Sequence, residues 1–450
     1  MHLRWGPRRR SPRLLARGGG LDLISDLPDD LLLLVLAGLP CVSAAARTEV
    51  LSRRWRSLWA RLGQIVFSDV PFHSLEAVLR RLPRPIPVLS LLEIRFPNER
   101  LPWPIPEEHL VDAASVNSLL RAAARLEPEE FEFELPANLL DGPLIVDLPC
   151  FHRATSILLD LHPVGVILRV PAGVEFPALE ELHLWACTVD IDALLSCSPR
   201  LRTLCLSNVY SDSDDDLVVS ATVAVSSTSL QELVLRQTDW MDGVNIVAPV
   251  LKQLTVSFSV IGKVSIFVLA PMAEMVSWRC CYLEVPIVFG VWRLEQVTLQ
   301  TAATPGQLPS LHIHASANSI FVCEEETFMH EMEKHMIAEF SVLELHLETN
   351  GHVFGALAFH VLRMNRLCSA RRKLKVILQR SSVKEGCSCS PHCPCESTGW
   401  RSQTISLTGI EEVEINGCGG DDHEIDFMKL ILECAPMLKK IIAVRWGLIK

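Results

Sequence analysis

The residue types best suited to metal chemistry are concentrated in one short stretch of the chain. Four thiols and one imidazole lie within nine residues, at Cys387, Cys389, His392, Cys393 and Cys395. Structural zinc sites usually pair two Cys-x-x-Cys knuckles across a longer segment, because one tight loop rarely wraps around a tetrahedral ion. The compressed spacing here therefore favours a cysteine-rich loop without a metal. Zinc binding by these five residues is the alternative, and it would only order the loop locally.

Two other groups of candidate ligands have spacings that do not suit a metal. His330 and His335 resemble the histidine pair of a zinc-protease helix, but they are five residues apart, so their side chains diverge by about 140° on a helix. We expect a solvent-exposed helix face there. The acidic run Asp212–Asp216 lacks the alternating ligands and the distal glutamate of a calcium-binding loop, so we expect it to be a surface insertion.

The sequence contains no phosphate-binding loop, dinucleotide-binding glycine pattern or nucleophile elbow. We therefore expect no catalytic residue, no cofactor and no metal. A hydrolase that uses a metal at the cysteine-rich stretch is the alternative from the enzyme class.

The composition indicates a folded chain with more than one structural unit. Its 450 residues exceed what one hydrophobic core usually supports, and they are 49% hydrophobic and 21% charged. No stretch approaches the roughly 20 apolar residues of a membrane span. The 15 cysteines are sparse and odd in number, and no Asn-x-Ser/Thr acceptor occurs, so we expect reduced thiols and a cytoplasmic or nuclear location.

The formal net charge of -11 is divided unevenly along the chain. The first twenty residues hold six arginines and no acid, which leaves -17 for the rest, and we expect them to form a basic disordered tail. Nucleic-acid binding is disfavoured, because contacts with a phosphate backbone need clustered cations. We therefore expect protein partners, and neither nucleic acid nor membrane among them.

Residues 21–64 have the pattern of three short helices. Pro28 suits the first turn of a helix, and two aspartates follow it, where the positive end of a helix favours acids. Apolar residues recur at three- and four-residue spacing up to Leu39, and Gly38 and Pro40 end the helix. Ser43 and Ser52 can cap two further helices. Because so short a segment buries little surface by itself, we expect its apolar residues to bind a partner.

The order of these residues resembles the F-box, particularly the plant form with a Leu-Ser-Arg-Arg-Trp stretch, which lies here at residues 51–55. In that family the helices dock on the Skp-type adaptor of a cullin–RING ubiquitin ligase. The resemblance implies adaptor binding by Leu27, Pro28, Leu32, Val35, Leu36, Leu39, Val50, Leu51, Trp55 and Trp59. A bundle that packs only on the rest of the chain is the alternative, and several of these residues must be core residues in either case.

A second pattern, Leu-x-x-Leu-x-Leu, recurs along the chain. Its clearest copies start at residues 179, 201, 230, 251, 272 and 294, and the one long interval contains the acidic run. Weaker copies start at residues 91, 154 and 342, and a strand-like run follows at 374–378. Cys187 and Cys280 each lie three residues past the last position of a copy, and the resemblance of the pattern to leucine-rich repeats implies a buried structural residue there, at a strand-to-loop corner. Each repeat can bury its apolar edge only by stacking on its neighbours, so we predict a solenoid over residues 85–380.

The repeats resemble the leucine-rich repeats that follow the F-box in many plant proteins, which implies a parallel sheet on the concave side and loops that recognise a partner. Residues 404–445 resemble the FBD module of the same proteins and predict a strand-helix-strand unit that covers the open end of the solenoid. The matching positions are Ile410, Glu411, Glu412, Val413, Glu414, Ile415, Gly417, Gly420, Glu424, Phe427, Leu430, Ala435, Leu438, Lys439 and Lys440.

The predicted fold class is therefore α/β, with a short three-helix F-box, an irregular leucine-rich-repeat solenoid and a C-terminal strand-helix-strand cap. The predicted segments are the basic tail at 1–20, the F-box at 21–64, a connector at 65–84, the solenoid at 85–380, the cysteine-rich loop at 381–403 and the FBD-like unit at 404–450.

The resemblance implies a non-catalytic substrate-recognition subunit of an SCF-type ubiquitin ligase. The F-box would bind the Skp-type adaptor and, through it, the cullin scaffold, while the repeats would bind a protein substrate that the sequence does not name. A leucine-rich-repeat interaction scaffold outside any ligase is the alternative function.

Overall fold

The computed structural model divides by its contacts into two units, Met1–Leu62 and Gly63–Lys450. The predicted basic tail and the acidic run lie outside the described residues, as does most of the cysteine-rich loop. The structure describes residues 24, 27–39, 41–56, 58–68, 70–82, 89–96, 111–135, 144–162, 165–211, 222–284, 286–301, 308–317, 325–364, 372–380, 393 and 399–445.

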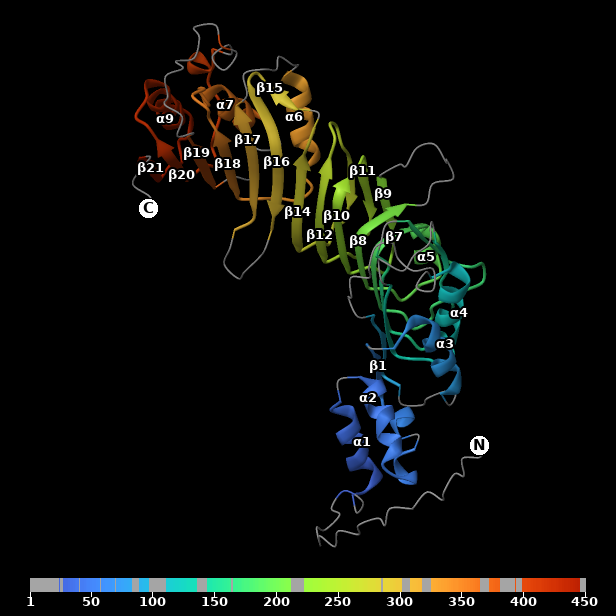
Figure 1. The fold of residues 1–450 in the computed structure, drawn as a ribbon. Coiled ribbons are helices and arrows are strands. Elements are labelled where there is room, and N and C mark those ends of the chain that lie inside the picture. The colour runs from blue at the N-terminus through green and yellow to red at the C-terminus, as the bar shows by residue number, and fades with distance from the viewer. Residues whose placement is uncertain are drawn as a thin grey trace, which may run out of the picture. The chain divides into compact units, whose positions relative to one another are not determined.

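The first unit consists of short helices (Figure 1). The first helix begins after Pro28 and ends at Gly38, as predicted. The third predicted helix is wrong, because residues 53–61 form two short 3-10 helices instead; they bring Trp55 and Leu58 into the core of the unit. The elements are α1 (Asp29–Ala37), α2 (Val42–Arg47), η1 (Thr48–Val50), η2 (Arg53–Trp55) and η3 (Trp59–Arg61).

The second unit is built on one long sheet. Figure 1 shows its strands side by side, with α6, α7 and α9 on one side of the sheet. In space the main strands follow the order β1, β2, β3, β5, β7, β8, β10, β12, β14, β16, β17, β18, β19, β20 and β21.

The strands of this unit are β1 (Gln64–Phe67), β2 (Leu91–Ile94), β3 (Glu130–Glu134), β4 (Leu144–Asp147), β5 (Ser156–Asp160), β6 (Val166–Arg169), β7 (Glu181–Val189), β8 (Thr203–Ser211), β9 (Thr222–Ser226), β10 (Glu232–Trp240), β11 (Gly243–Val247), β12 (Gln253–Val260), β13 (Ser265–Leu269), β14 (Met275–Tyr282), β15 (Val288–Phe289), β16 (Trp292–Gln300), β17 (Ser310–Ala317), β18 (Val342–Glu348), β19 (Lys373–Gln379), β20 (Glu412–Cys418) and β21 (Lys440–Arg445). Its helices are α3 (Phe72–Arg81), α4 (Ala113–Ala124), α5 (Ile191–Ser196), α6 (Glu325–Lys334), α7 (Gly355–Arg363), η7 (Trp400–Ser402) and α9 (Asp422–Cys434).

The leucine pattern sets the register of this sheet. Leu182, Leu204, Leu233 and Leu254 are directly paired from one parallel strand to the next, and all four are buried. The intervening residues stand on the open face of the sheet, because side chains alternate along a strand. The predicted α/β fold class, with a helical N-terminal region and a strand-rich repeat region, is confirmed.

Strand β16 departs from the predicted parallel sheet, because it pairs antiparallel with both β14 and β17. The connections that flank it, residues 283–291 and 301–309, are shorter than the dozen or so residues that a crossover between parallel strands needs. The chain instead reverses at Gly290, which has a positive φ of 58°, and returns as β16.

The return segments also form strands. β9, β11 and β13 make a separate three-stranded parallel sheet, and β4 pairs with β6. The predicted connector at 65–84 is likewise wrong in part: β1 pairs in parallel with β2, and α3 packs against α4. The repeat array therefore begins at the start of the second unit.

Cys187 and Cys280 are buried, as expected for structural residues, but they lie within β7 and β14 rather than at the ends of strands. Burial raises the pKa of the Cys187 thiol to about 12. The predicted strand-helix-strand order at the C-terminal end is present as β20, α9 and β21. Among the described residues, no helix is both long and apolar enough to cross a membrane.

Candidate functional site

The core of the first unit contains three of the predicted adaptor-binding residues. Leu32, Leu36 and Trp55 are buried there together with Ala45, Leu58 and Leu62. Leu27, Leu39 and Trp59 pack against this core and are partly buried. The assignment of Leu32, Leu36 and Trp55 to a binding surface is therefore corrected, because so small a unit needs its largest side chains for its own core.

Polar contacts connect the helices of this unit. Asp29 on α1 accepts a hydrogen bond of 3.0 Å from Nε of Arg54 and forms an ion pair of 3.2 Å with Arg61. The hydrogen bond from Arg54 lowers the pKa of Asp29. The indole Nε1 of Trp59 donates to Glu49 Oε1 at 2.7 Å. These contacts determine which side chains remain on the outside.

The exposed apolar residues of the first unit are Ile24, Leu31, Leu34, Val35, Val50 and Leu51, with exposed fractions of 56%, 43%, 68%, 54%, 87% and 64%. Three of them were predicted from the sequence, and Ile24, Leu31 and Leu34 were missed. The sequence could have revealed Leu31 and Leu34, because they and Val35 follow helical spacing. They lie on the face of α1 opposite Leu32 and Leu36. Pro28, also predicted, is exposed.

The cysteine-rich candidates lie mostly outside the described residues: this applies to Cys387, Cys389, His392 and Cys395. Cys393 is described and is buried, with its Sγ 3.4 Å from Nδ1 of His352. This contact connects Cys393 of the loop to His352, which lies in the segment after β18.

His330 and His335 lie in different environments. His330 is exposed, whereas His335 is fully buried, so the expected solvent-exposed helix face is wrong for His335. Trp278 Nε1 donates to its Nδ1 at 2.9 Å, and its Nε2 lies 2.7 Å from the Tyr282 hydroxyl. Because Nδ1 accepts, the proton of the neutral ring is on Nε2, which donates to Tyr282. Burial lowers the pKa of His335 to about 3.

A cluster of titratable side chains that sequence reasoning missed lies on the open face of the second unit. His312 on β17 is paired in register with Glu344 on β18, and His314 with His346. One donor atom each from His312, Glu344 and His346 lies within 4.8 Å of the others. The signal was present as His-x-His and Glu-x-His, because residues two apart share a face of a strand. The two pairs lie far apart in the sequence, so the pattern did not show that they are on neighbouring strands of the sheet.

A second group of possible ligands, Asp421, His423 and Glu424, is already occupied by protein contacts. Glu424 is buried, and its carboxylate accepts from the backbone N–H groups of Gly419, Gly420 and Asp421 at 2.8–3.1 Å. Arg380 pairs with both Glu424 and Asp421. This group therefore holds the start of α9 on the end of β19.

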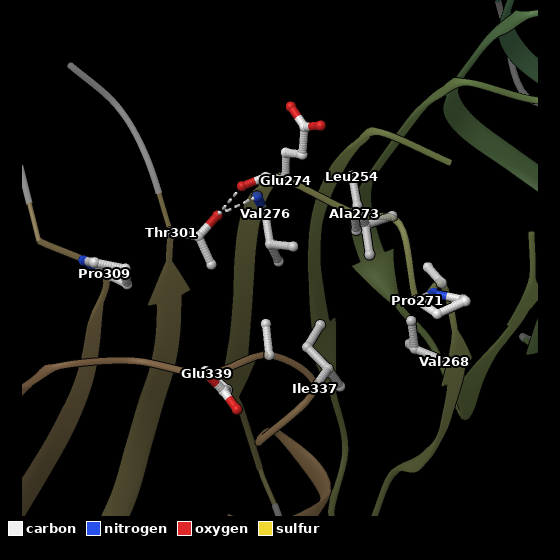
Figure 2. Close-up of a pocket in the computed structure, with 12 residues that line it drawn as sticks. Leu254, Val268, Pro271, Ala273, Glu274, Val276, Thr301, Pro309, Ile337 and Glu339 are labelled. Atoms are coloured by element: carbon white, nitrogen blue, oxygen red, sulfur yellow. Dashed lines mark hydrogen bonds between the residues drawn. The ribbon is translucent and has the colours of Figure 1, made fainter. Parts of the chain in front are cut away.

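A cavity of about 490 Å³ lies beside the ends of β12, β13, β14 and β16 (Figure 2). Most of the lining residues are apolar, with Leu254, Val268 and Ile337 among them, but polar atoms also line the cavity. Thr301 Oγ1 donates to the carbonyl of Glu274 at 3.1 Å and accepts from the N–H of Val276 at 2.6 Å. Figure 2 shows the Glu274 carboxyl group pointing away from the other labelled side chains. The cavity therefore presents polar as well as apolar atoms and shows no preference for an apolar ligand.

Two known families match parts of the chain. The F-box domain matches residues 24–64, and the family described as "FBD-associated F-box protein At5g56370, LRR repeats" matches residues 116–276. The chain carries an F-box and FBD-associated leucine-rich repeats. The resemblance predicted from the sequence is confirmed. F-box domains generally bind Skp-type adaptors, and F-box proteins with such repeats are typically non-catalytic adaptors.

Similar proteins are F-box proteins of Arabidopsis thaliana. The putative FBD-associated F-box protein At5g56560 is 27% identical over 40% of this chain and 40% of its own length. The F-box/FBD/LRR-repeat protein At4g26340 is 26% identical over 53% of this chain and 55% of its own length. The FBD-associated F-box protein At5g18780 is 30% identical over 42% of each chain. The chain thus spans about half the length of the curated relatives that it matches.

Proposed function

We propose that this chain is the substrate-recognition subunit of an SCF-type cullin–RING ubiquitin ligase. The F-box docks on the Skp-type adaptor, which connects it to the cullin scaffold, and the repeats bind a protein target. The chain itself carries out no bond chemistry. It raises the effective concentration of a target lysine near the ubiquitin-loaded enzyme, so the geometry of the complex determines transfer.

The observation that carries this proposal is a set of exposed apolar residues on α1 and at the end of η1 in the F-box: Leu31, Leu34, Val35, Val50 and Leu51. Helix α1 is apolar on its inner face, at Leu32 and Leu36, and on its outer face as well. A helix that is apolar all round is normally covered on all sides. A protein partner that covers these side chains fits this requirement, and it agrees with the F-box match at residues 24–64.

The test replaces two of these residues, Val50→Glu and Leu51→Glu, in the full chain. Both side chains are exposed, so the fold should persist, while any partner that buries them loses apolar contact and meets two buried charges. Complete burial of one such side chain contributes about 1.5–3 kcal/mol. We expect the Kd for a purified Skp-type adaptor, measured by calorimetry, to rise at least a hundredfold in the double variant.

Leu432→Glu is the matched control, because Leu432 is exposed to 58% but lies on α9 in the second unit. It should leave adaptor binding unchanged. Adaptor binding that survives in the double variant at wild-type strength would refute the docking assignment. A native pull-down that contains other partners but lacks both adaptor and cullin would favour the scaffold outside any ligase.

The same double variant offers a way to find the target. It should bind the target through the repeats without delivering it for ubiquitin transfer, so the target should accumulate on it and be identified by mass spectrometry. We also propose a cytoplasmic or nuclear location, because no disulfide joins any of the ten cysteines among the described residues. Imaging of the fluorescently labelled chain tests this location, and secretion would contradict it.

A further inference from the structure

Three potential metal ligands converge on the open face of the repeat sheet. His312 and Glu344 are register partners on the parallel strands β17 and β18, and His346 follows Glu344 by two residues on the same face. Oε2 of Glu344 lies 3.6 Å from Nδ1 of His312 and 3.4 Å from Nε2 of His346. All three side chains are half-buried. Two imidazoles thus face the same carboxylate oxygen.

The separations between these donor atoms suit a tetrahedral ion. Zinc binds nitrogen and carboxylate oxygen at about 2.0–2.2 Å, and a tetrahedron of that size has ligand-to-ligand edges of about 3.3–3.6 Å. The separations of 3.6 Å and 3.4 Å from Glu344 match two of these edges, and the donor atoms of His312 and His346 lie within 4.8 Å of each other. Two of the three ligand-to-ligand edges are therefore already close to the required length.

The hydrogen bonds of the two imidazoles leave the facing nitrogens available. Nε2 of His312 lies 2.8 Å from the hydroxyl of Ser310, so this nitrogen can carry the proton and leave Nδ1 as an acceptor directed at Glu344. Metal-binding histidines are almost always oriented by such a contact at the other ring nitrogen. Nε2 of His346 is buried and makes no hydrogen bond of normal geometry with the described residues, although Oε2 of Glu344 lies 3.4 Å away. A metal ion would bridge these two atoms.

We propose that His312, Glu344 and His346 form a zinc-binding site on the open face of the repeat sheet. Two imidazoles and one carboxylate are a ligand set that zinc accepts, and imidazole favours zinc over magnesium or calcium. Water occupies the fourth position, as in other zinc sites with three protein ligands. The site does not depend on the F-box assignment, so the two proposals can fail separately.

Lys375 on β19 is the main competitor for this position. Its Nζ lies 3.5 Å from the same Oε2 of Glu344, so the ammonium group supplies the neighbouring positive charge when no metal is bound. A zinc ion would displace it, and its flexible side chain can turn toward solvent. Removing this like charge with Lys375→Met should strengthen zinc binding by about tenfold. A network that serves only as a salt bridge would show no such gain.

The experiment titrates Zn²⁺ into the reduced full chain by calorimetry and Co²⁺ by absorption spectroscopy. Loss of an orienting partner alone weakens metal binding by about 10–100-fold, so His346→Gln should weaken zinc binding at least a hundredfold, and Ser310→Ala about tenfold. His314→Gln is the matched control: His314 lies on the same face of β17, its ring stacks on His346 at 4.2 Å, and it is outside the donor group. It should change binding less than threefold.

Two measurements distinguish zinc binding at these three residues from binding at the cysteine-rich segment and from a loss of folding. Cobalt bound here should show tetrahedral absorption without a thiolate charge-transfer band, whereas binding by the cysteine-rich segment would show that band. Thermal unfolding without metal shows whether each variant is folded, and Lys375→Met tests the site by a gain of affinity that misfolding does not produce. The proposal is overturned if zinc does not bind, if His346→Gln binds zinc like the wild type, or if His314→Gln loses as much affinity as His346→Gln.

Discussion

The buried ion pair between Arg380 and Glu424 should be one of the most sensitive positions for the stability of the C-terminal repeats. Arg380 directly follows β19, and Glu424 lies in the first turn of α9. Their side chains are 9% and 1% exposed. Arg380 also donates from Nε to the carbonyl of Gly417 at 3.1 Å, and Glu424 completes the capping box with Asp421. The pair therefore joins a strand end, a turn and a helix start.

Arg380→Met should destabilise this region by about 3–5 kcal/mol, because it leaves the Glu424 carboxylate buried without its cation. Glu424→Gln should cost about 1–3 kcal/mol, since an amide oxygen can still accept from the three backbone N–H groups. In the double variant neither side chain leaves an uncompensated charge. Its cost should therefore fall below the sum of the single costs by about 1–3 kcal/mol.

Hydrogen exchange of the α9 amides in the full chain, combined with urea unfolding, measures these costs. Lys429→Met is the control, because Lys429 pairs with Asp426 on the same helix at 3.4 Å but is 66% exposed, so its loss should cost no more than about 0.5 kcal/mol. The reasoning fails if Arg380→Met costs no more than this control, or if the two single costs are simply additive.

Two further predictions concern the second unit. The pKa of His335 is about 3 in the folded chain and about 6.5 when unfolded, so its contribution to stability is complete above pH 6.5 and is lost as the pH falls toward 3. Between pH 7 and pH 5 the wild type should lose about 2 kcal/mol more stability in urea than His335→Asn; equal slopes would contradict this. Gly417→Ala should destabilise more than Gly173→Ala by about 2 kcal/mol in thermal unfolding. Both glycines have φ above 80°, but only the Cβ at position 417 would overlap a neighbour, the carbonyl oxygen of Leu378. Equal costs would show that backbone strain alone matters.

The leucine pattern predicted the position of many strands but not their direction. Its copy at residue 272 was wrong in register, because Met272 and Met275 are exposed while Val276 and Trp278 are buried. The template residues Leu294, Val297 and Leu299 of β16 are all buried, just as Leu204 and Leu206 are in β8. An alternating pattern is the same when read in either direction, so it carries no information about whether a strand runs parallel. The feature that indicates the reversed direction of β16 is the shortness of the connections on both of its sides.

The F-box pattern predicted where helices lie but did not separate their inner and outer faces. In α1, apolar residues stand at almost every position, so helical spacing alone does not decide whether Leu32 or Leu31 is buried. The packing of Trp55 and Leu58 against Leu32 and Leu36 makes that choice. On α9 the same difficulty appears in Ile425 and Leu432, which fit the predicted helix but are exposed, whereas Phe427 and Ile431 are buried.

Strand β16 lies between β14 and β17, and helix α6 connects the parts of the sheet on its two sides. Without α6, only β16 would hold these two parts together, and the sheet would be weak there. This helix lies in the connection from β17 to β18, and its last turn reaches back to the other side of β16. There Glu331 accepts from the N–H of Val264 at 3.3 Å, and Lys334 donates to the carbonyl of Val264 at 2.8 Å. His335, one residue past the helix, bonds to Trp278 and Tyr282 on β14.

Buried polar contacts of this kind stabilise only one arrangement, because each group loses its partner if the elements shift. The strands before and after β16 should therefore move as one body, and the register that brings His312 to Glu344 depends on that rigidity. It follows that His335→Asn should increase hydrogen exchange in β14 and α6 together. Increased exchange confined to α6 would show that the two sides of the reversed strand are independent.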